Sequence, residues 1–303
     1  IGWAYSIKGE TYQALTCMVG ALKLAETVHN NSLFASIFNG FGATYSRANL
    51  VERSMQNYKE ALSYLEGTNT QATNLVTKRI VLTNLGILFN YKQEYDSALN
   101  YLQRAMELWV LLTKDSRVNP GLFYGRLGNT YLALRQNKLA YACYQTNLDY
   151  AKRFKSARMI SAAYYWLGKY HLQTGNEDSA LDYFQLALPF FDEKVVGADY
   201  QVDLPLNLYL TFKRKGNDKE ALKYLELYNN AKQKEDSLHQ KHQMEVLSFE
   251  EDQRQQTVAA EKVKRAEERI RNLQYAAIAL GLLSFVILFF LLSHSIIANP
   301  KII

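Results

Sequence analysis

The chain has 303 residues, of which 48% are hydrophobic, 13% aromatic and 21% charged, and its formal net charge is +6. The basic residues are scattered among acidic ones and form no block interleaved with aromatic residues, which argues against a nucleic-acid-binding surface in this chain. Four prolines and 15 glycines are few for this length and favour a largely helical protein. Cys17 and Cys143 lie far apart on separate apolar faces, so we expect buried free thiols rather than a disulfide.

Residues 1–230 contain a pattern that recurs about every 41 residues. In each clear copy a Leu-Gly pair is followed three residues later by an aromatic residue or His, and 12 residues after the Gly by Ala. An aromatic residue or Leu follows four residues beyond that Ala. Self-similarity at such a period is typical of repeat proteins. The copies at 85–106, 127–148 and 167–188 align without a gap, and weaker copies occupy 1–22 and 208–228.

One further copy starts at residue 41 and is interpreted as reaching residue 65. In this interpretation Ala61 is the alanine of the pattern, which leaves about seven extra residues between it and Gly42. Seven residues are close to two turns of α-helix, so we expect the apolar faces of this copy to line up with those of its neighbours.

Each copy has the pattern of two antiparallel helices joined by a turn. We expect the glycine to let the neighbouring helix approach the first helix closely, and the alanine to do the same on the second helix. Gly175 and Gly216 lie in predicted turns where the backbone needs a positive φ. The expected contact residues are Gly42, Gly86, Gly128 and Gly168 on first helices, and Ala14, Ala61, Ala98, Ala140, Ala180 and Ala221 on second helices.

This pattern resembles the tetratricopeptide repeat, which has the same Leu-Gly, aromatic and Ala positions. The resemblance covers residues 1–230, with the first repeat truncated, and implies an all-α solenoid of about six helical hairpins. In such a fold the first helices line a concave face that takes extended peptides or partner helices. The glycines stand 40 to 44 residues apart, against about 34 in the basic family, so longer helices or linkers are expected.

Residues 231–272 are expected to form a long charged helix or coiled coil. They contain nine Lys or Arg and nine Asp or Glu residues, with no Gly and no Pro. Within 259–273, apolar residues alternate at spacings of four and three, the seam of a coiled coil that would allow a homodimer. A single solvated helix is the alternative, because the seam covers only about two heptads. The seam residues are Ala259, Val263, Ala266, Ile270 and Leu273.

Residues 273–297 are predicted to form a transmembrane helix. No Lys, Arg, Asp or Glu occurs between Asn272 and Pro300. At about 1.5 Å of rise per residue, roughly 20 apolar residues cross a hydrocarbon core of about 30 Å. A buried core helix is the alternative, but core helices rarely extend this far without a charge. Residues 298–303 are interpreted as the start of a truncated C-terminal region.

Two arguments about which side of the membrane the repeats occupy give opposite answers. Five basic residues within 262–271 precede the span and only Lys301 follows it, so the positive-inside rule puts the repeats in the cytoplasm. The order of repeats, charged helix and membrane helix resembles bacterial inner-membrane proteins whose exported repeats precede the anchor, which implies an extracytoplasmic array. We take the second as the expectation, and the cytoplasmic alternative stays open.

The sequence contains no Gly-rich phosphate loop, no HExxH, no paired CxxC and no GxSxG. We therefore predict no catalytic residues, no cofactor and no metal site in this chain. His239 and His242 lie three residues apart and could share a metal on one helical face, but two ligands without a third are too few. On a charged helix we expect both imidazoles to be solvated.

Polar residues on the first helices are the candidates for contact with a partner. In tetratricopeptide arrays that bind a terminal carboxylate, Asn and Lys or Arg project from set positions of successive first helices, and by that resemblance Asn84 and Arg126 match. The preceding copy has Asn39 and Ala43 where Lys and Asn are expected, so the set is incomplete. The predicted groove residues are Asn39, Asn84, Arg126, Asn129, Tyr165 and Lys169, with solvated surface residues as the alternative.

Two functional hypotheses follow. The preferred one is a membrane-anchored scaffold or adaptor that docks a protein or peptide partner in the groove and contacts lipid through 273–297. The alternative is the sensory half of a signalling protein, a histidine kinase or a transcriptional regulator, whose output domain lies beyond residue 303. The residues after Lys301 would distinguish the two.

Overall fold

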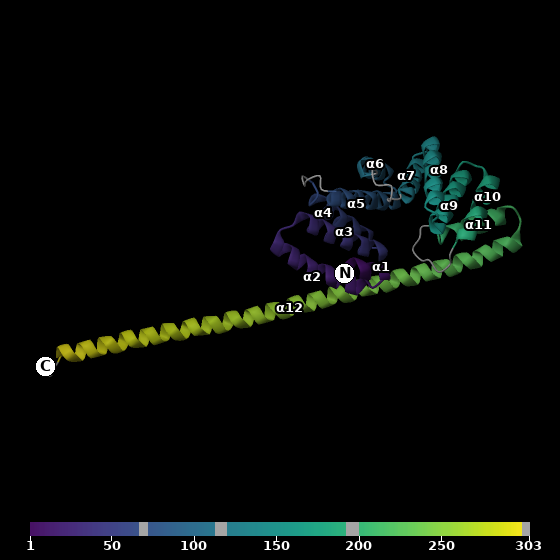
Figure 1. Cartoon of the computed structure of the whole chain (residues 1–303). Helices are drawn as coiled ribbons and strands as arrows, with labels where there is room; N and C mark the ends of the chain where they lie inside the picture. Colours follow the sequence, from purple (N-terminus) through teal and green to yellow (C-terminus); the bar gives the residue numbers. More distant parts are fainter. Residues whose placement is uncertain (67–71, 113–119, 192–199, 299–303) are drawn as a thin grey trace. The chain divides into compact units, whose positions relative to one another are not determined.

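The computed structural model describes residues 1–66, 72–112, 120–191 and 200–298 (Figure 1). All regular secondary structure in these ranges is helical. The predicted C-terminal region, residues 298–303, lies outside them except for Ala298, which ends the last helix.

The helices of the described ranges form six consecutive helix–turn–helix pairs, which confirms the predicted solenoid of six helical hairpins. A short 3-10 helix, η1 (Leu188–Phe190), follows the fifth pair. The pairs are α1 (Gly2–Lys8) with α2 (Thr11–Val28), α3 (Asn31–Arg47) with α4 (Val51–Ser63), α5 (Ala72–Tyr91) with α6 (Tyr95–Leu112), α7 (Gly121–Ala133) with α8 (Asn137–Arg153), α9 (Ala157–Gln173) with α10 (Glu177–Ala187), and α11 (Asp203–Arg214) with the start of α12 (Asp218–Ala298).

The turn inside every pair uses one residue in the left-handed region of backbone conformation. Gly175 and Gly216 have φ values of 84° and 70°, as predicted from their place in the pattern. In three pairs a residue with a side chain adopts this conformation, which costs more than it does for glycine. The six turn residues are Gly9, Asn49, Gln93, Arg135, Gly175 and Gly216.

At the glycine of the pattern the two helices of a pair are in close contact. A Cβ added to Gly128 would lie 2.6 Å from a ring carbon of Tyr144, a distance that real Cβ atoms do not show. Tyr144 itself is fully buried, so its ring has no free space to move into. This confirms the predicted role of the glycine. The same contact joins Gly42 to Tyr58, Gly86 to Leu102 and Gly168 to Phe184, always 16 residues further along the chain.

The prediction of about seven extra residues in the second pair is wrong. Gly42 meets Tyr58 at the same separation as in the other pairs, so no insertion is present. The residue 12 positions after Gly42 is Ser54, which is fully buried and donates a hydrogen bond of 2.7 Å to the Gly42 carbonyl. Serine is nearly as small as alanine, and this bond satisfies its hydroxyl. Ala61 instead occupies the later small-residue position that Ala105 and Ala187 occupy in other pairs.

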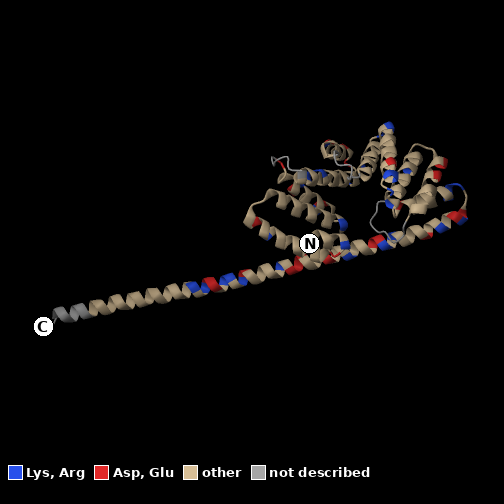
Figure 2. Ribbon diagram, viewed as in Figure 1, with Lys and Arg blue, Asp and Glu red and all other residues tan. Residues whose placement is uncertain are grey.

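The chain divides into two compact units, residues 1–246 and 247–303. The first unit contains the six pairs and includes α12 as far as Val246, beyond the predicted end of the array near residue 230. The second unit consists of the rest of the chain, and its described part is helical to Ala298. Charged residues occur along α12 up to Arg271 and then cease (Figure 2).

We predict that Gly128→Ala lowers the free energy of unfolding by about 1–3 kcal/mol, because the added methyl group overlaps a packed ring. Gly20→Ala is the matched control: it lies within α2, and an added Cβ there meets no atom within 4 Å. This control should raise stability by about 0.5–1 kcal/mol through helix propensity. Thermal unfolding of the detergent-solubilised chain, followed by circular dichroism, measures both. Equal midpoints for Gly128→Ala and the wild type would contradict the packing role.

Candidate functional site

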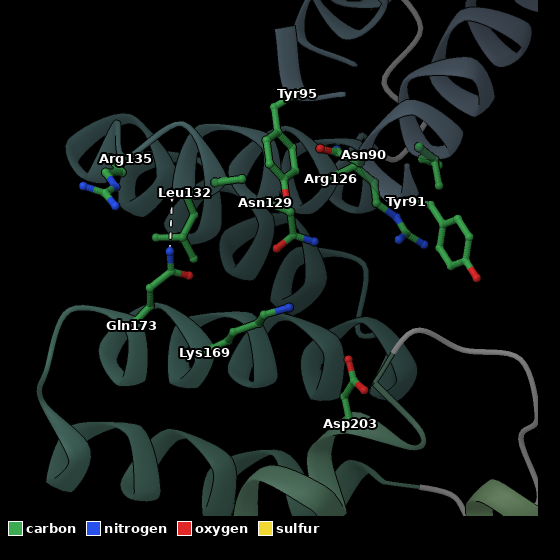
Figure 3. A pocket seen from close by; sticks show the side chains of 12 residues that line it. Asn90, Tyr91, Tyr95, Arg126, Asn129, Leu132, Arg135, Lys169, Gln173 and Asp203 are labelled. Atoms are coloured by element: carbon green, nitrogen blue, oxygen red, sulfur yellow. Dashed lines mark hydrogen bonds between the residues drawn. The ribbon is translucent and has the colours of Figure 1, made fainter. Parts of the chain in front are cut away.

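The first helices of four consecutive pairs line a cleft with a volume of about 780 Å³ (Figure 3). Its walls come from α5, α7 and α9, with a contribution from the start of α11. The lining residues are Ile87, Asn90, Tyr91, Tyr95, Arg126, Asn129, Leu132, Ala133, Arg135, Lys169, Gln173 and Asp203.

The repeat pattern explains why these residues share the cleft. Residues three or four apart lie on the same side of a helix, and Arg126, Asn129 and Ala133 follow that spacing on α7. The residue directly after the repeat glycine reaches the cleft in three consecutive pairs. These residues are Ile87, Asn129 and Lys169.

Three cations and one carboxylate give the cleft its charge. Arg126, Arg135 and Lys169 line it together with Asp203, so positive charge is in excess. Arg126 is half-buried, and this burial, with a contribution from nearby Arg158, lowers the pKa of its guanidinium to about 10. The group is therefore charged at neutral pH and sits where an anion would be attracted more strongly than in bulk water.

Buried tyrosines hold two of the polar residues in the cleft. The hydroxyl of Tyr144 donates to Asn129 Oδ1 at 2.8 Å, which fixes the amide and leaves its nitrogen as a donor. Tyr165 donates to Asp203 Oδ2 at 3.0 Å and is itself only 1% exposed. Burial and the neighbouring carboxylate raise the pKa of Tyr165, so it remains a neutral donor. Gln173 bridges the two walls by donating to the Leu132 carbonyl at 3.5 Å (Figure 3).

The six predicted groove residues are only partly brought together. Arg126, Asn129 and Lys169 line the cleft, whereas Tyr165 lies buried behind Asp203. Asn84 does not line the cleft, and its amide donates to the hydroxyl of Tyr58 at 3.0 Å. Asn39 also lies away from the cleft, and its Oδ1 is buried without a hydrogen-bond partner among the described residues.

Six polar residues of the cleft were not predicted. Asn90, Tyr91 and Gln173 lie one helical turn beyond the residue that follows the glycine, so the repeat spacing could have identified them. Tyr95 and Arg135 belong to turns or their neighbours, and Asp203 starts α11, so only the fold brings these three to the cleft. The additional polar residues are Asn90, Tyr91, Tyr95, Arg135, Gln173 and Asp203.

The expectation that both His239 and His242 are solvated is wrong for His242. Its side chain is only 2% exposed, and its Nδ1 lies 2.8 Å from the hydroxyl of Thr11. The reason is that this part of α12 packs against the beginning of α2 instead of standing free in solvent. Cys17 and Cys143 are free thiols, as expected; Cys143 is buried, but Cys17 is only partly buried.

A family model described as tetratricopeptide repeat matches residues 161–188, which lie in the fifth helical pair. The fifth pair therefore carries a tetratricopeptide repeat. A segment of 184 residues, 61% of this chain, is 26% identical to the anaphase-promoting complex subunit CDC16 of Saccharomyces cerevisiae and spans 19% of that protein. The chain thus matches about a fifth of the length of this curated relative.

Two solved structures show the same repeat architecture. The Rap conjugation gene regulator of plasmid pLS20, in complex with the Phr* peptide, is similar with a TM-score of 0.56 and 17% identity, over 75% of this chain and 61% of that one. The type IV pilus biogenesis factor PilW is similar with a TM-score of 0.52 and 17% identity, over 74% of this chain and 86% of that one. At these identities the likeness concerns the fold alone.

We predict that Asn84→Ala lowers the free energy of unfolding by about 1 kcal/mol, because it removes the hydrogen bond to the buried Tyr58 hydroxyl. Asn84 lies outside the cleft, so the affinity for a partner should stay unchanged. Asn129→Ala should lower the stability by a similar amount, because it removes the acceptor of the buried Tyr144 hydroxyl, and should in addition weaken partner binding, because its amide faces the cleft. Chemical unfolding and peptide titration of both variants separate the two effects. Weaker partner binding by Asn84→Ala would show that Asn84 contacts the partner.

Proposed function

We propose that the protein is a membrane-anchored interaction module whose cleft binds an extended acidic segment of a protein partner. The observation that carries this proposal is the convergence of Arg126, Asn129 and Lys169 from consecutive first helices into one cleft. The similar Rap structure contains a bound peptide, which supports a peptide as the type of ligand.

The chemistry of the lining favours an extended chain as the ligand. An extended segment exposes backbone amides and carbonyls that need partners, and the side-chain amides of Asn90, Asn129 and Gln173 can donate and accept. Arg126 and Lys169 supply charge-assisted hydrogen bonds for a carboxylate of the partner. Tyr91 is 66% exposed and offers an aromatic surface for an apolar side chain.

We predict that an array of decapeptides selects sequences containing Asp or Glu when probed with the purified full chain. Arg126→Ala and Lys169→Ala should each lower the affinity for the selected peptide by about tenfold, which corresponds to about 1.4 kcal/mol. Arg153→Ala and Lys138→Ala are matched controls, since both side chains are exposed on α8 and neither lines the cleft. Fluorescence anisotropy measures the affinities. Equal losses in cleft and control variants would contradict the proposed site.

The last part of α12 is the proposed membrane anchor. Every large apolar side chain described between Tyr275 and Leu291 is exposed within this chain. Removing such surface from water is favourable by about 25 cal/mol per Å², and the helix is long enough to enter a bilayer. Residues 273–297 therefore remain our proposed transmembrane helix, with bacterial inner membrane and an extracytoplasmic array as further parts of the proposal.

We predict that Leu282→Lys combined with Phe285→Lys releases the protein from the membrane fraction. Each lysine near the bilayer centre costs about 2.5–3.5 kcal/mol. Gln256→Lys combined with Thr257→Lys adds the same charge outside the apolar segment and should leave the protein in the membrane. Alkaline carbonate extraction followed by immunoblotting measures the distribution. A wild-type chain that partitions into the soluble fraction would exclude the anchor.

A signalling role is the second candidate, and one observation favours it. α12 is a single helix from Asp218 to Ala298, so the last helix of the array is continuous with the charged segment and the proposed span. The apolar seam residues Val263, Ile270 and Leu273 are exposed within the chain, and a homodimer through 259–273 stays a prediction. A kinase or helix-turn-helix domain encoded after residue 303 would support this role, whereas further apolar helices or a stop codon would support the scaffold.

A further inference from the structure

α12 returns to the beginning of the array and makes polar contacts with the first two pairs. His242 Nδ1 lies 2.8 Å from Thr11 Oγ1, and Glu245 Oε2 accepts from the backbone N–H of Thr11 at 2.6 Å. Gln243 donates to the Ala48 carbonyl at 3.1 Å. These contacts join residues almost 200 or more positions apart in the sequence. We call the contacting residues Thr11, Ala48, His242, Gln243 and Glu245 the latch.

The latch supplies helix caps that the first pairs lack. α2 begins at Thr11, and the side chain of the preceding Glu10 makes no capping hydrogen bond. The carboxylate of Glu245 takes that place, because it accepts from both Thr11 and Tyr12, the latter at 3.2 Å. An anion at this position also interacts favourably with the positive end of the helix dipole. The beginning of α2 is therefore completed by a residue of the last pair.

The latch contains a buried histidine, His242. His242 is 2% exposed, and a Cβ added to Gly9 would lie only 3.3 Å from its Cε1, so α1 also covers the ring. Burial lowers the pKa of His242, since the charged imidazolium loses its hydration. The charged groups that act on the ring are Glu245, Lys241 and His239 on α12 and Arg47 on α3, of which only Glu245 favours protonation.

The direction of the pH dependence follows from that lowered pKa. The folded protein prefers the neutral ring, so the stabilisation is complete above the ordinary histidine pKa of about 6.5. It is lost as the pH falls through the lower value that His242 has in the folded protein. Separating α12 from α2 would expose the ring to water and let it accept the proton.

We propose that the latch is a releasable connection, and that protonation of His242 frees this part of α12 from the first two pairs. Release would disconnect the start of the array from the helix that continues toward residue 298. The device does not depend on what the cleft binds, so it can be tested without a partner.

The test uses hydrogen exchange of the 303-residue protein in lipid nanodiscs at pH 7.5 and pH 5.5, with correction for the intrinsic effect of pH on exchange. The amides of Thr11 and Tyr12 report directly on the latch, because they donate to Glu245. In the wild type their protection should fall at the lower pH, by up to about tenfold, the limit set by an exposed ring with the ordinary histidine pKa of about 6.5. Glu245→Ala should lose this protection at both pH values, which gives the signal of the released state.

Two variants in which residue 242 cannot be protonated test whether His242 is the group that causes the release. His242→Gln can still bond to Thr11, and His242→Phe fills a similar volume, so both should keep their protection level at pH 5.5. His239→Gln is the control on the same helix and should respond to pH as the wild type does. Unchanged wild-type protection at pH 5.5 would overturn the proposal. A wild-type response in whichever His242 variant folds, as judged by circular dichroism, would overturn it as well.

Discussion

The array depends on the close approach of two helices at a residue that has no side chain. At Gly128 the ring of Tyr144 lies so near the backbone of α7 that any Cβ would overlap it. The contact has the same separation in sequence in four pairs, so these four pairs have the same offset between their helices. Equal pairs can stack in register, and each one buries the apolar face that its neighbour cannot cover alone.

This packing also sets the geometry of the cleft. Because the glycine faces the second helix, the residue after it lies on another side of the first helix, and in three pairs that residue lines the cleft. Tyr144 connects the two functions: its ring contacts Gly128, and its hydroxyl holds the amide of Asn129. A side chain that packs the core therefore orients a side chain that faces a ligand. A change in the packing of this pair would therefore alter the orientation of Asn129 in the cleft.

The last helix of the array has two roles in the fold. Its beginning completes the sixth pair, and a segment further along caps α2 through Glu245 and bonds to the end of α3 through Gln243. These bonds are polar, and the same segment of α12 also buries the apolar side chain of Val246. The connection can open while the pairs stay intact, because the pairs retain their own buried cores.

The spacing of small and aromatic residues by itself determined the six helical pairs, the turns at Gly175 and Gly216, and the presence of Arg126, Asn129 and Lys169 among the candidates. These features are local, and helical periodicity alone places them. Only the tertiary structure showed that Ser54 replaces an alanine, that Asn84 bonds to Tyr58, and that Asp203 enters the cleft. It also decided that His242 is buried. The physical reason is that each of these depends on a contact between segments distant in sequence, and the pattern within a single helix carries no information about its neighbours.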